Sequence, residues 1–399
     1  MSLDVRGVRR EFALLERELG GRPLAYLDAA STAPRPRAVL AAIRAYHEHF
    51  TANVHRGVHA LAAEASDAFE DARHVVAAHI GASAAELVFT SGTTEAVNLV
   101  ADALRLRPDD EVLSTCVEHH SNLLPWRRHA RVCVLPSLAD GRPDLGELAR
   151  CCTPRTRVLA VHHASNVLGS IAPVRQLSAF ARSRGLLTFV DGAQAAGHLP
   201  IDVRVLDCDF YAFSGHKVGG PSGIGALYLR QGAQDALDAP RVGGGMVARV
   251  EANGCEWKSG VQRFEAGTPN VEGALGLAAA LRFLRAQGAR AIELHGRGLS
   301  RQLLEGCRRL PGVRVLGPTS ADERIPLVAL ALPSSGVDAE TVARTLSDAF
   351  GVLVSAGRHC AHPLHDQLGV EATLRASAWI HNDEDDIERF LDALAGLLA

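Results

Sequence analysis

Residues 207–228 read DCDFYAFSGHKVGGPSGIGALY, and this stretch decides the fold class. Two apolar runs, FYAFS (210–214) and GALYL (225–229), are typical of buried strands, and the glycine-rich segment between them carries a lysine. Similar runs alternate with helical patterns upstream, which predicts an α/β protein with a mostly parallel sheet covered on both faces. The upstream strands are predicted at LVFT (87–90), EVLST (111–115), RVLAVHH (157–163) and LTFVD (187–191).

Polar clusters follow five of these predicted strands. Ligands of open α/β sheets bind beyond the carboxyl ends of the strands, so the clusters predict one shared site. Packing alone does not explain why polar residues recur at this position. The five clusters are Ser91-Gly92-Thr93-Thr94, Glu118-His119-His120, Ser165-Asn166, Asp191-Gly192-Ala193-Gln194 and Ser214-Gly215-His216-Lys217.

The lysine of the opening stretch, Lys217, stands out in the composition. Of 42 basic residues, only Lys217 and Lys258 are lysines, and a coding bias toward arginine accounts for the rest. A guanidinium stays protonated, whereas a lysine amine can form a Schiff base with an aldehyde. A lysine that follows a strand and is flanked by Ser214, His216 and glycines fits that role better than a place on the surface.

Two further clusters favour the same chemistry. A helix is predicted to begin at Thr93 and Thr94, directly after a glycine turn, and its first turn carries two hydroxyl groups. Such a helix start can bind a phosphate group, although a simple helix cap is the alternative. Asp191 ends a buried strand and needs a cationic partner, either a structural salt bridge or a protonated pyridine nitrogen. Gln194 lies within reach of the phenolic oxygen of such a ring. Together with Lys217, these residues predict a pyridoxal-phosphate site.

The pattern changes after about Thr268. The sequence predicts a large α/β domain over 21–268 and a small α+β domain made of 1–20 and 269–399. Helices are predicted at 273–287, 290–309, 338–349 and 384–398, and strands at 312–316, 326–332 and 351–354.

The overall composition excludes several classes of partner. The formal net charge is -3 and no long basic run occurs, so we expect no nucleic-acid partner. No apolar segment is long enough to span a membrane, and the charged start MSLDVRGVRREF argues against a signal peptide, which together predict a cytoplasmic protein. The eight cysteines are scattered, and histidine pairs such as His162/His163 lack a second ligand pair, so no metal site is expected.

Motifs along nearly the whole chain resemble the class V aminotransferase superfamily, and within it the Suf-type cysteine desulfurases, a group that includes selenocysteine lyases. The resemblance implies a type I pyridoxal-phosphate fold with a seven-stranded, mostly parallel sheet in the large domain and a homodimer. The matching stretches are YLDAASTAPRP (26–36), NVHRGVHALA (53–62), FTSGTTEAVNLVA (89–101), EHHSNLLPW (118–126), SNVLGSI (165–171), VDGAQAAGH (190–198), DCDFYAFSGHKVGGPSGIGALY (207–228), RFEAGTPN (263–270), RHCAHP (358–363) and LRAS (374–377).

The resemblance also implies roles for individual residues. His119 would stack on the pyridine ring, Asp191 would pair with the ring nitrogen, and Gln194 with the phenolic oxygen. Asn166 and Arg375 would hold the substrate carboxylate, which the planar fork of arginine suits. The phosphate would bind Thr94, Ser214 and His216, together with Thr268 of the other subunit, and the entrance would be lined by His55 and Arg56.

Cys360 would be the nucleophile that takes sulfur from L-cysteine. A thiol needs positive neighbours to become a reactive thiolate, and Arg358 and His359 are candidates in the sequence. Suf-type enzymes usually show Arg-Thr-Gly-His-His-Cys before this position, whereas here Ser355 replaces the arginine and Arg358 a histidine. These departures leave the sulfur acceptor and the substrate preference open. The short segment predicts a cysteine held in place rather than carried on a long loop.

The resemblance thus implies a cysteine desulfurase that makes L-alanine and passes a persulfide from Cys360 to an acceptor protein. The alternatives within the fold are a selenocysteine lyase, a cysteine sulfinate desulfinase, or another pyridoxal-phosphate lyase or epimerase. An inactive scaffold that binds a sulfur acceptor is the alternative from another class. The presence of Lys217, Asp191 and Arg375 argues against it, because a scaffold has no physical need of them.

Overall fold

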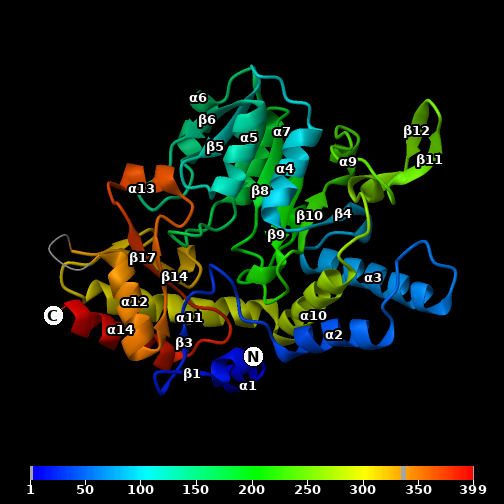
Figure 1. Ribbon diagram of the computed structural model, residues 1–399. Helices are drawn as coiled ribbons and strands as arrows, with labels where there is room; N and C mark the ends of the chain where they lie inside the picture. The colour runs from blue at the N-terminus through cyan, green and yellow to red at the C-terminus, as the bar shows by residue number, and fades with distance from the viewer. Residues whose placement is uncertain (1–2, 334–337, 399) are drawn as a thin grey trace.

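The computed structural model describes residues 3–333 and 338–398, and a seven-stranded sheet forms its centre (Figure 1). The strand order is β4-β10-β9-β8-β7-β5-β6. Only β10 is reversed, because it pairs antiparallel with both β4 and β9, whereas all other pairs are parallel. The strands are β4 (Leu87–Thr90), β5 (Glu111–Thr115), β6 (Arg131–Leu135), β7 (Thr156–His162), β8 (Leu187–Asp191), β9 (Phe210–Ser214) and β10 (Gly225–Leu229).

This topology confirms the predicted α/β class and the mostly parallel sheet. Because β10 is reversed between β4 and β9, the other six strands run in one direction, and all five polar clusters end at one edge. Apolar side chains alternate between the two faces: Val161 packs in one core and Ala160 in the other. The helices beside the sheet are α2 (Arg37–His49), α3 (Ala60–His79), α4 (Thr93–Ala103), α5 (Leu124–His129), α6 (Leu148–Cys151), α7 (Val174–Ser183), α8 (Val203–Leu206), α9 (Gln231–Gln234) and α10 (Val271–Gln287).

The C-terminal part forms a second, smaller sheet with its own core. Its strand order is β13-β14-β17-β16, all pairs are antiparallel, and α11, α12 and α14 pack against it. The strands of this sheet are β13 (Arg314–Leu316), β14 (Leu327–Ala331), β16 (Ser355–Gly357) and β17 (Thr373–Ser377), and a separate short strand, β15 (Val352–Leu353), precedes β16. The helices are α11 (Ala289–Arg308), α12 (Ala339–Phe350), α13 (His362–Leu368) and α14 (Glu384–Leu398).

The N-terminal segment lies against this C-terminal part (Figure 1). In α1 (Val5–Arg10), Arg9 pairs with Asp386 at 2.6 Å, and β3 (Ala25–Tyr26) pairs with β15. The long helix α10 packs on α2 and α3. The two sheets are therefore tied together by both chain ends. The division at residue 268 stays a prediction, and residues 1–2, 334–337 and 399 of the predicted small domain lie outside the described residues.

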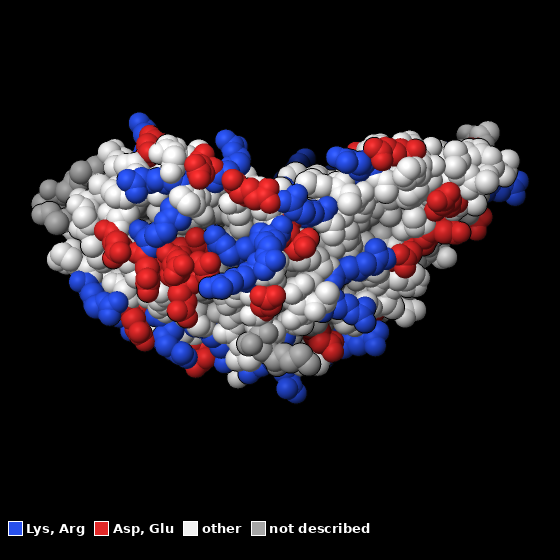
Figure 2. Space-filling model, turned by 90° about the horizontal axis from the view of Figure 1, so that it is seen from below, with Lys and Arg blue, Asp and Glu red and all other residues white. Residues whose placement is uncertain are grey.

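Two surface features complete the description. The hairpin of β11 (Val247–Glu251) and β12 (Gly254–Trp257) projects from the body, and the short strands β1 (Glu18–Leu19) and β2 (Arg22–Pro23) pair near the N-terminus (Figure 1). On the face seen from below, acidic and basic side chains lie side by side rather than forming a field of one sign (Figure 2). Among the described residues, no helix combines the length and apolar character that crossing a membrane requires.

Candidate active site

A cavity of about 460 Å³ lies at the carboxyl edge of the central sheet, where the polar clusters meet. It is bounded on the other side by Ser355 and Ala356 of the small sheet. Most of the residues predicted from the sequence line this one cavity, which brings together segments as far apart as residues 93 and 375. They are Thr93, Thr94, His119, Asn166, Asp191, Gln194, Ser214, His216, Lys217, Cys360 and Arg375.

Lys217 lies in the single turn after β9 and reaches this cavity. Removal from water lowers the pKa of its amine from 10.5 to about 8, although the Asp191 carboxylate opposes the shift. A substantial fraction of the amine is therefore neutral and nucleophilic near neutral pH. Lys258, the other lysine, lines a different cavity.

Asp191 ends β8 in a buried position, as the sequence predicts. Its Oδ1 accepts a hydrogen bond from the N–H of Ala193 at 2.9 Å. Burial raises the pKa of the Asp191 carboxyl, and the Ala193 bond and Lys217 counteract this. A buried carboxylate of this kind is suited to bind a cationic group in the cavity.

The first turn of α4 forms one end of the cavity. The N–H of Thr93 donates to Ser214 Oγ at 2.9 Å, and the hydroxyl of Thr94 lies 2.7 Å from that of Ser121. Gly92 precedes the helix with φ 152°, and a Cβ there would lie 3.1 Å from Ser214 Oγ. A helix start with nearby hydroxyl groups is suited to an anion, and the phosphate site predicted here stays a prediction; Ser121 was not among the residues predicted for it.

His119 is neutral in this cavity. Burial, with smaller contributions from Lys217 and His120, lowers the pKa of the ring to about 4. The N–H of Ser121 donates to His119 Nδ1 at 3.1 Å, so the single ring proton sits on Nε2. Gln194 is buried nearby, and its amide donates to the carbonyl of Ala30 at 2.8 Å.

Arg375 on β17 supplies a buried cation. Its Nη2 donates to Ser31 Oγ at 2.6 Å and to Asp28 Oδ1 at 3.1 Å, and its Nη1 donates to the carbonyl of Asn166 at 3.0 Å. Its Nε is buried without a partner. Ser355 lies opposite Arg375 on the neighbouring strand β16. Asp28 and Ser31 belong to the matched stretch 26–36, but only the structure shows that they orient Arg375.

Cys360 lies in the four-residue connection between β16 and α13 and is exposed at the cavity. His359 and Cys360 both adopt left-handed backbone conformations, with φ of 46° and 55°. Non-glycine residues hold such conformations only where their surroundings enforce them. Here the amide of Asn166 donates to the His359 carbonyl at 2.8 Å, and the N–H of His120 to the Cys360 carbonyl at 2.9 Å. The cysteine is thus held on a short, fixed segment.

The comparisons with known proteins agree with this geometry. A family model described as aminotransferase class-V matches residues 25–390. The chain belongs to the aminotransferase class-V family. This membership confirms the predicted enzyme class and the cofactor, pyridoxal 5'-phosphate. The narrower assignment to the Suf-type group stays a prediction.

Several relatives within the class-V family are cysteine desulfurases. A probable cysteine desulfurase of Halalkalibacterium halodurans is 40% identical and covers 98% of this chain and 97% of its own length. The apo structure of a cysteine desulfurase from Thermococcus onnurineus NA1 has a TM-score of 0.93 at 35% identity, covering 100% of this chain and 98% of its own. The S-sulfonic acid form of a cysteine desulfurase from Escherichia coli has a TM-score of 0.90 at 36% identity, covering 100% and 99%.

The residues present fit the cofactor that the class-V family requires. The cavity joins an anion site at the start of α4, an amine at Lys217 and a carboxylate at Asp191. Among the described residues, His162 Nε2 and Arg375 Nε are buried side-chain atoms without a hydrogen-bond partner, and both side chains line this cavity.

The structure corrects one expectation about the nucleophile. Arg358 donates to the Asp366 carboxylate at 2.9 Å and to the Glu371 carbonyl at 3.0 Å. Burial and the charge of Arg375 lower the pKa of His359 to about 3, so this ring is neutral. Neither residue therefore offers Cys360 a free positive charge. Lys217 and Arg375, which line the same cavity as Cys360, are the cations available to it.

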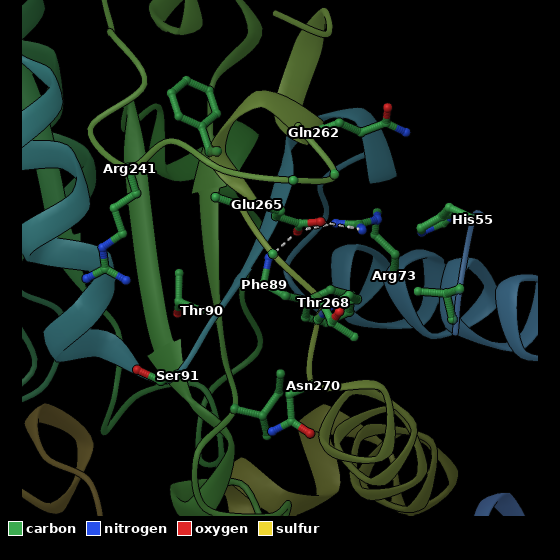
Figure 3. Close-up of a pocket in the computed structure, with 18 of the residues that line it drawn as sticks. His55, Arg73, Phe89, Thr90, Ser91, Arg241, Gln262, Glu265, Thr268 and Asn270 are labelled. Atoms are coloured by element: carbon green, nitrogen blue, oxygen red, sulfur yellow. Dashed lines mark hydrogen bonds and ion pairs between the residues drawn. The ribbon is translucent and has the colours of Figure 1, made fainter. Parts of the chain in front are cut away.

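The three remaining predicted residues, His55, Arg56 and Thr268, lie elsewhere. They are exposed and line a second cavity of about 500 Å³, whose wall includes Thr90 and Ser91 at the end of β4 (Figure 3). Its wall contains Arg73, which pairs with Glu265 at 2.6 Å. Within one chain these three residues do not join the Lys217 cavity.

Proposed function

We propose that this class-V enzyme is a cysteine desulfurase, which converts L-cysteine to L-alanine and carries the sulfur as a persulfide on Cys360. The observation that carries the proposal is the placement of Cys360, Lys217 and Arg375 around one cavity. Cys360 supplies a thiol to this cavity, and Lys217 supplies an amine whose pKa is lowered. Arg375 supplies a cation that can bind the carboxylate of a substrate. The cysteine desulfurases among the relatives support the same activity.

We assign the cofactor contacts as the sequence predicted them. Thr93, Thr94, Ser214 and His216 would hold the phosphate, Asp191 the ring nitrogen, Gln194 the phenolic oxygen and His119 the ring face, with the aldehyde carbon joined to the Lys217 amine. When bound, pyridoxal phosphate acts as an electron sink for the bonds around the substrate α-carbon. The remaining steps depend on side chains of this chain.

Lys217 acts as the base. Its lowered pKa means that the free amine can take the α-proton of L-cysteine near neutral pH. The Arg375 guanidinium, which lines the cavity, fixes the substrate carboxylate. Because Ser31 and Asp28 already hold Nη2 and the Asn166 carbonyl holds Nη1, little side-chain freedom is lost on binding.

Cys360 then removes the sulfur. Its thiolate attacks the substrate sulfur, so an S–S bond forms while the Cβ–S bond breaks. The electron pair of the broken bond stays with the substrate carbon, which takes up a proton and leaves as L-alanine. The Nε2–H of neutral His119 is a donor within the same cavity.

We further propose a homodimer in which His55, Arg56 and Thr268 complete the partner's site. Their position in a second, exposed cavity, apart from Lys217 of the same chain, supports this arrangement. Val58, in the loop after Arg56, is fully exposed, and a neighbouring subunit would cover it. The exposed thiol of Cys360 remains open to a sulfur-acceptor protein.

The persulfide itself provides the test. The holoenzyme is incubated with L-cysteine, its thiols are alkylated, and its peptides are analysed by mass spectrometry. We expect one additional sulfur atom on the Cys360 peptide and none on the Cys255 peptide, whose thiol is equally exposed. Alanine release is measured in parallel from cysteine, selenocysteine and cysteine sulfinate. Alanine release from selenocysteine or the sulfinate alone, without sulfur on Cys360, would replace the desulfurase by one of those lyases.

A further inference from the structure

His162 occupies a buried position between two acidic residues beneath the cavity floor. It ends β7, and its Nδ1 lies 2.7 Å from Glu118 Oε1. On the neighbouring parallel strand, Asp191 is its register partner at the end of β8. Both residues line the Lys217 cavity. His162 and Glu118 are only 4% and 0% exposed, so water does not screen this pair.

Glu118 determines where the ring proton of His162 lies. The Thr115 hydroxyl accepts from the N–H of Val117 and therefore donates to Glu118 Oε1 at 2.8 Å, while the Asn122 amide donates to Oε2 at 2.7 Å. Glu118 thus acts as an acceptor at both oxygens, and Nδ1 of His162 must donate to it. The other ring nitrogen, Nε2, is buried and has no hydrogen-bond partner among the described residues, and the side chain lines the cavity.

Asp191 needs a positive neighbour that persists through the reaction. Burial, the largest influence, and the charge of Glu118 disfavour its ionised form, whereas the Ala193 hydrogen bond, Lys217 and, to a smaller extent, His162 favour it. Lys217 gives up its free ammonium when it carries the cofactor, so its contribution is not constant. His162 takes no part in the chemistry and retains its charge.

We propose that His162 is a positioning residue, a buried imidazolium that Glu118 holds in place and that keeps Asp191 ionised to bind the cofactor ring. This rests on the proposed role of Asp191 at the ring nitrogen. Burial alone would lower the pKa of His162, but the charge of Glu118, its hydrogen bond and the charge of Asp191 outweigh it and raise the pKa. The other ionisable groups around this position are Lys217 after β9, His119 after Glu118, and the adjacent His163.

The adjacent histidine provides a matched control. His163 is also buried, but its Nδ1 lies 3.0 Å from the hydroxyl of Tyr211, and burial lowers the pKa of its ring to about 4. His162→Asn retains a donor for Glu118 while removing the charge and Nε2. His163→Asn makes the same chemical change at a neutral ring.

The test follows cofactor binding rather than turnover. Each full-length variant is stripped and titrated with pyridoxal phosphate from about pH 6 to about pH 9. We expect His162→Asn to bind more weakly than the parent, by up to about tenfold for a shift of one pKa unit at Asp191, with the largest difference at the low-pH end, where Asp191 takes up a proton. His163→Asn should stay within about twofold of the parent. Equal affinities and equal pH profiles for both variants would overturn the proposal.

A second measurement does not require a folded variant. In the unmodified holoenzyme with ¹⁵N-labelled histidine, NMR should show one imidazolium, with both ring nitrogens protonated, that persists at pH 7, above the pKa of an ordinary histidine. Glu118→Gln should remove it. Absence of any such imidazolium at pH 7 would overturn the proposal even if His162→Asn fails to fold. Neither readout depends on cysteine, so a failed desulfuration assay and a failed histidine assignment are distinguishable.

Discussion

The backbone N–H of His120 donates to the carbonyl of Cys360 at 2.9 Å and so joins the loop after β5 to the proposed nucleophile. His119, the proposed ring-stacking residue, is the immediate neighbour of His120. Together with the bond from the Asn166 amide to the His359 carbonyl, this hydrogen bond holds the thiol segment of the small sheet against the loops of the large sheet. This link explains how a cysteine of the small sheet reaches a cofactor site built on the large one.

The two lysines give the first prediction. Lys217→Ala should lose the visible band of bound cofactor and all turnover, because no other amine lines the cavity. Lys258→Ala, which changes a side chain of the second cavity, should keep both. Borohydride reduction followed by peptide mass spectrometry identifies the residue that carries the cofactor. Cofactor found on Lys258 would contradict the assignment.

The lowered pKa of Lys217 predicts a pH profile. In Lys258→Ala, Lys217 is the only lysine left, and only its neutral amine attacks an aldehyde. The neutral fraction rises as the pH rises through the pKa, so the rate of cofactor incorporation into stripped protein should rise with a midpoint of about 8. Stopped-flow absorbance measures this rate. A midpoint near the ordinary value of 10.5 would show that the cavity does not perturb the amine.

Asn166 gives a prediction about the cysteine segment. Its amide bond to the His359 carbonyl supports two left-handed residues, and losing such a bond costs about 1 kcal/mol, or about fivefold in rate. Asn166→Ala should therefore lower alanine release from cysteine about fivefold and leave release from selenocysteine nearly unchanged, since selenium leaves more easily without Cys360. An equal loss on both substrates would instead place Asn166 at their shared carboxylate.

Mixed dimers test the role of Thr268 across the interface. A dimer of Lys217→Ala with Thr268→Ala would contain one complete site only if Thr268 serves the partner. A dimer of the double variant with the parent chain would contain one complete site only if Thr268 serves its own chain. We expect about half of the parent activity in the first mixture and a clear loss of it in the second. The reverse order, or an active monomer in sedimentation, would contradict the shared site.

The sequence predicted the fold through its strands. The runs 87–90, 111–115, 187–191, 210–214 and 225–229 coincide with strands of the central sheet, because continuous apolar runs reflect burial on both faces. The half-exposed edge strand β6 was not predicted, since its pattern, which includes Arg131 and an exposed Val134, lacks such a run. The antiparallel direction of β10 also depends on tertiary pairing, and its sequence pattern does not predict that direction.

The site was predictable only in part. Strand-end residues such as Lys217 and Asp191 follow from position, because strand ends share one edge. The orientation of Arg375 by Asp28 depends on a contact between residues 347 positions apart, and local patterns do not contain it. The charge at Cys360 was misjudged for the same reason, because Arg358 is neutralised by Asp366 and not by a sequence neighbour. In the sequence, His162 was considered only with His163 as a possible metal-binding pair. In the structure its partner is Glu118.

Cys360→Ala tests the central claim most directly. Alanine release from L-cysteine is measured for the holoenzyme, for Cys360→Ala and for Cys255→Ala, which removes an equally exposed thiol outside the cavity. We predict that Cys360→Ala keeps the cofactor spectrum but loses about 10²-fold or more in rate, as expected when a covalent nucleophile is removed, while Cys255→Ala matches the parent. Release of alanine by Cys360→Ala at the parent rate would contradict the account and make Cys360 a structural residue.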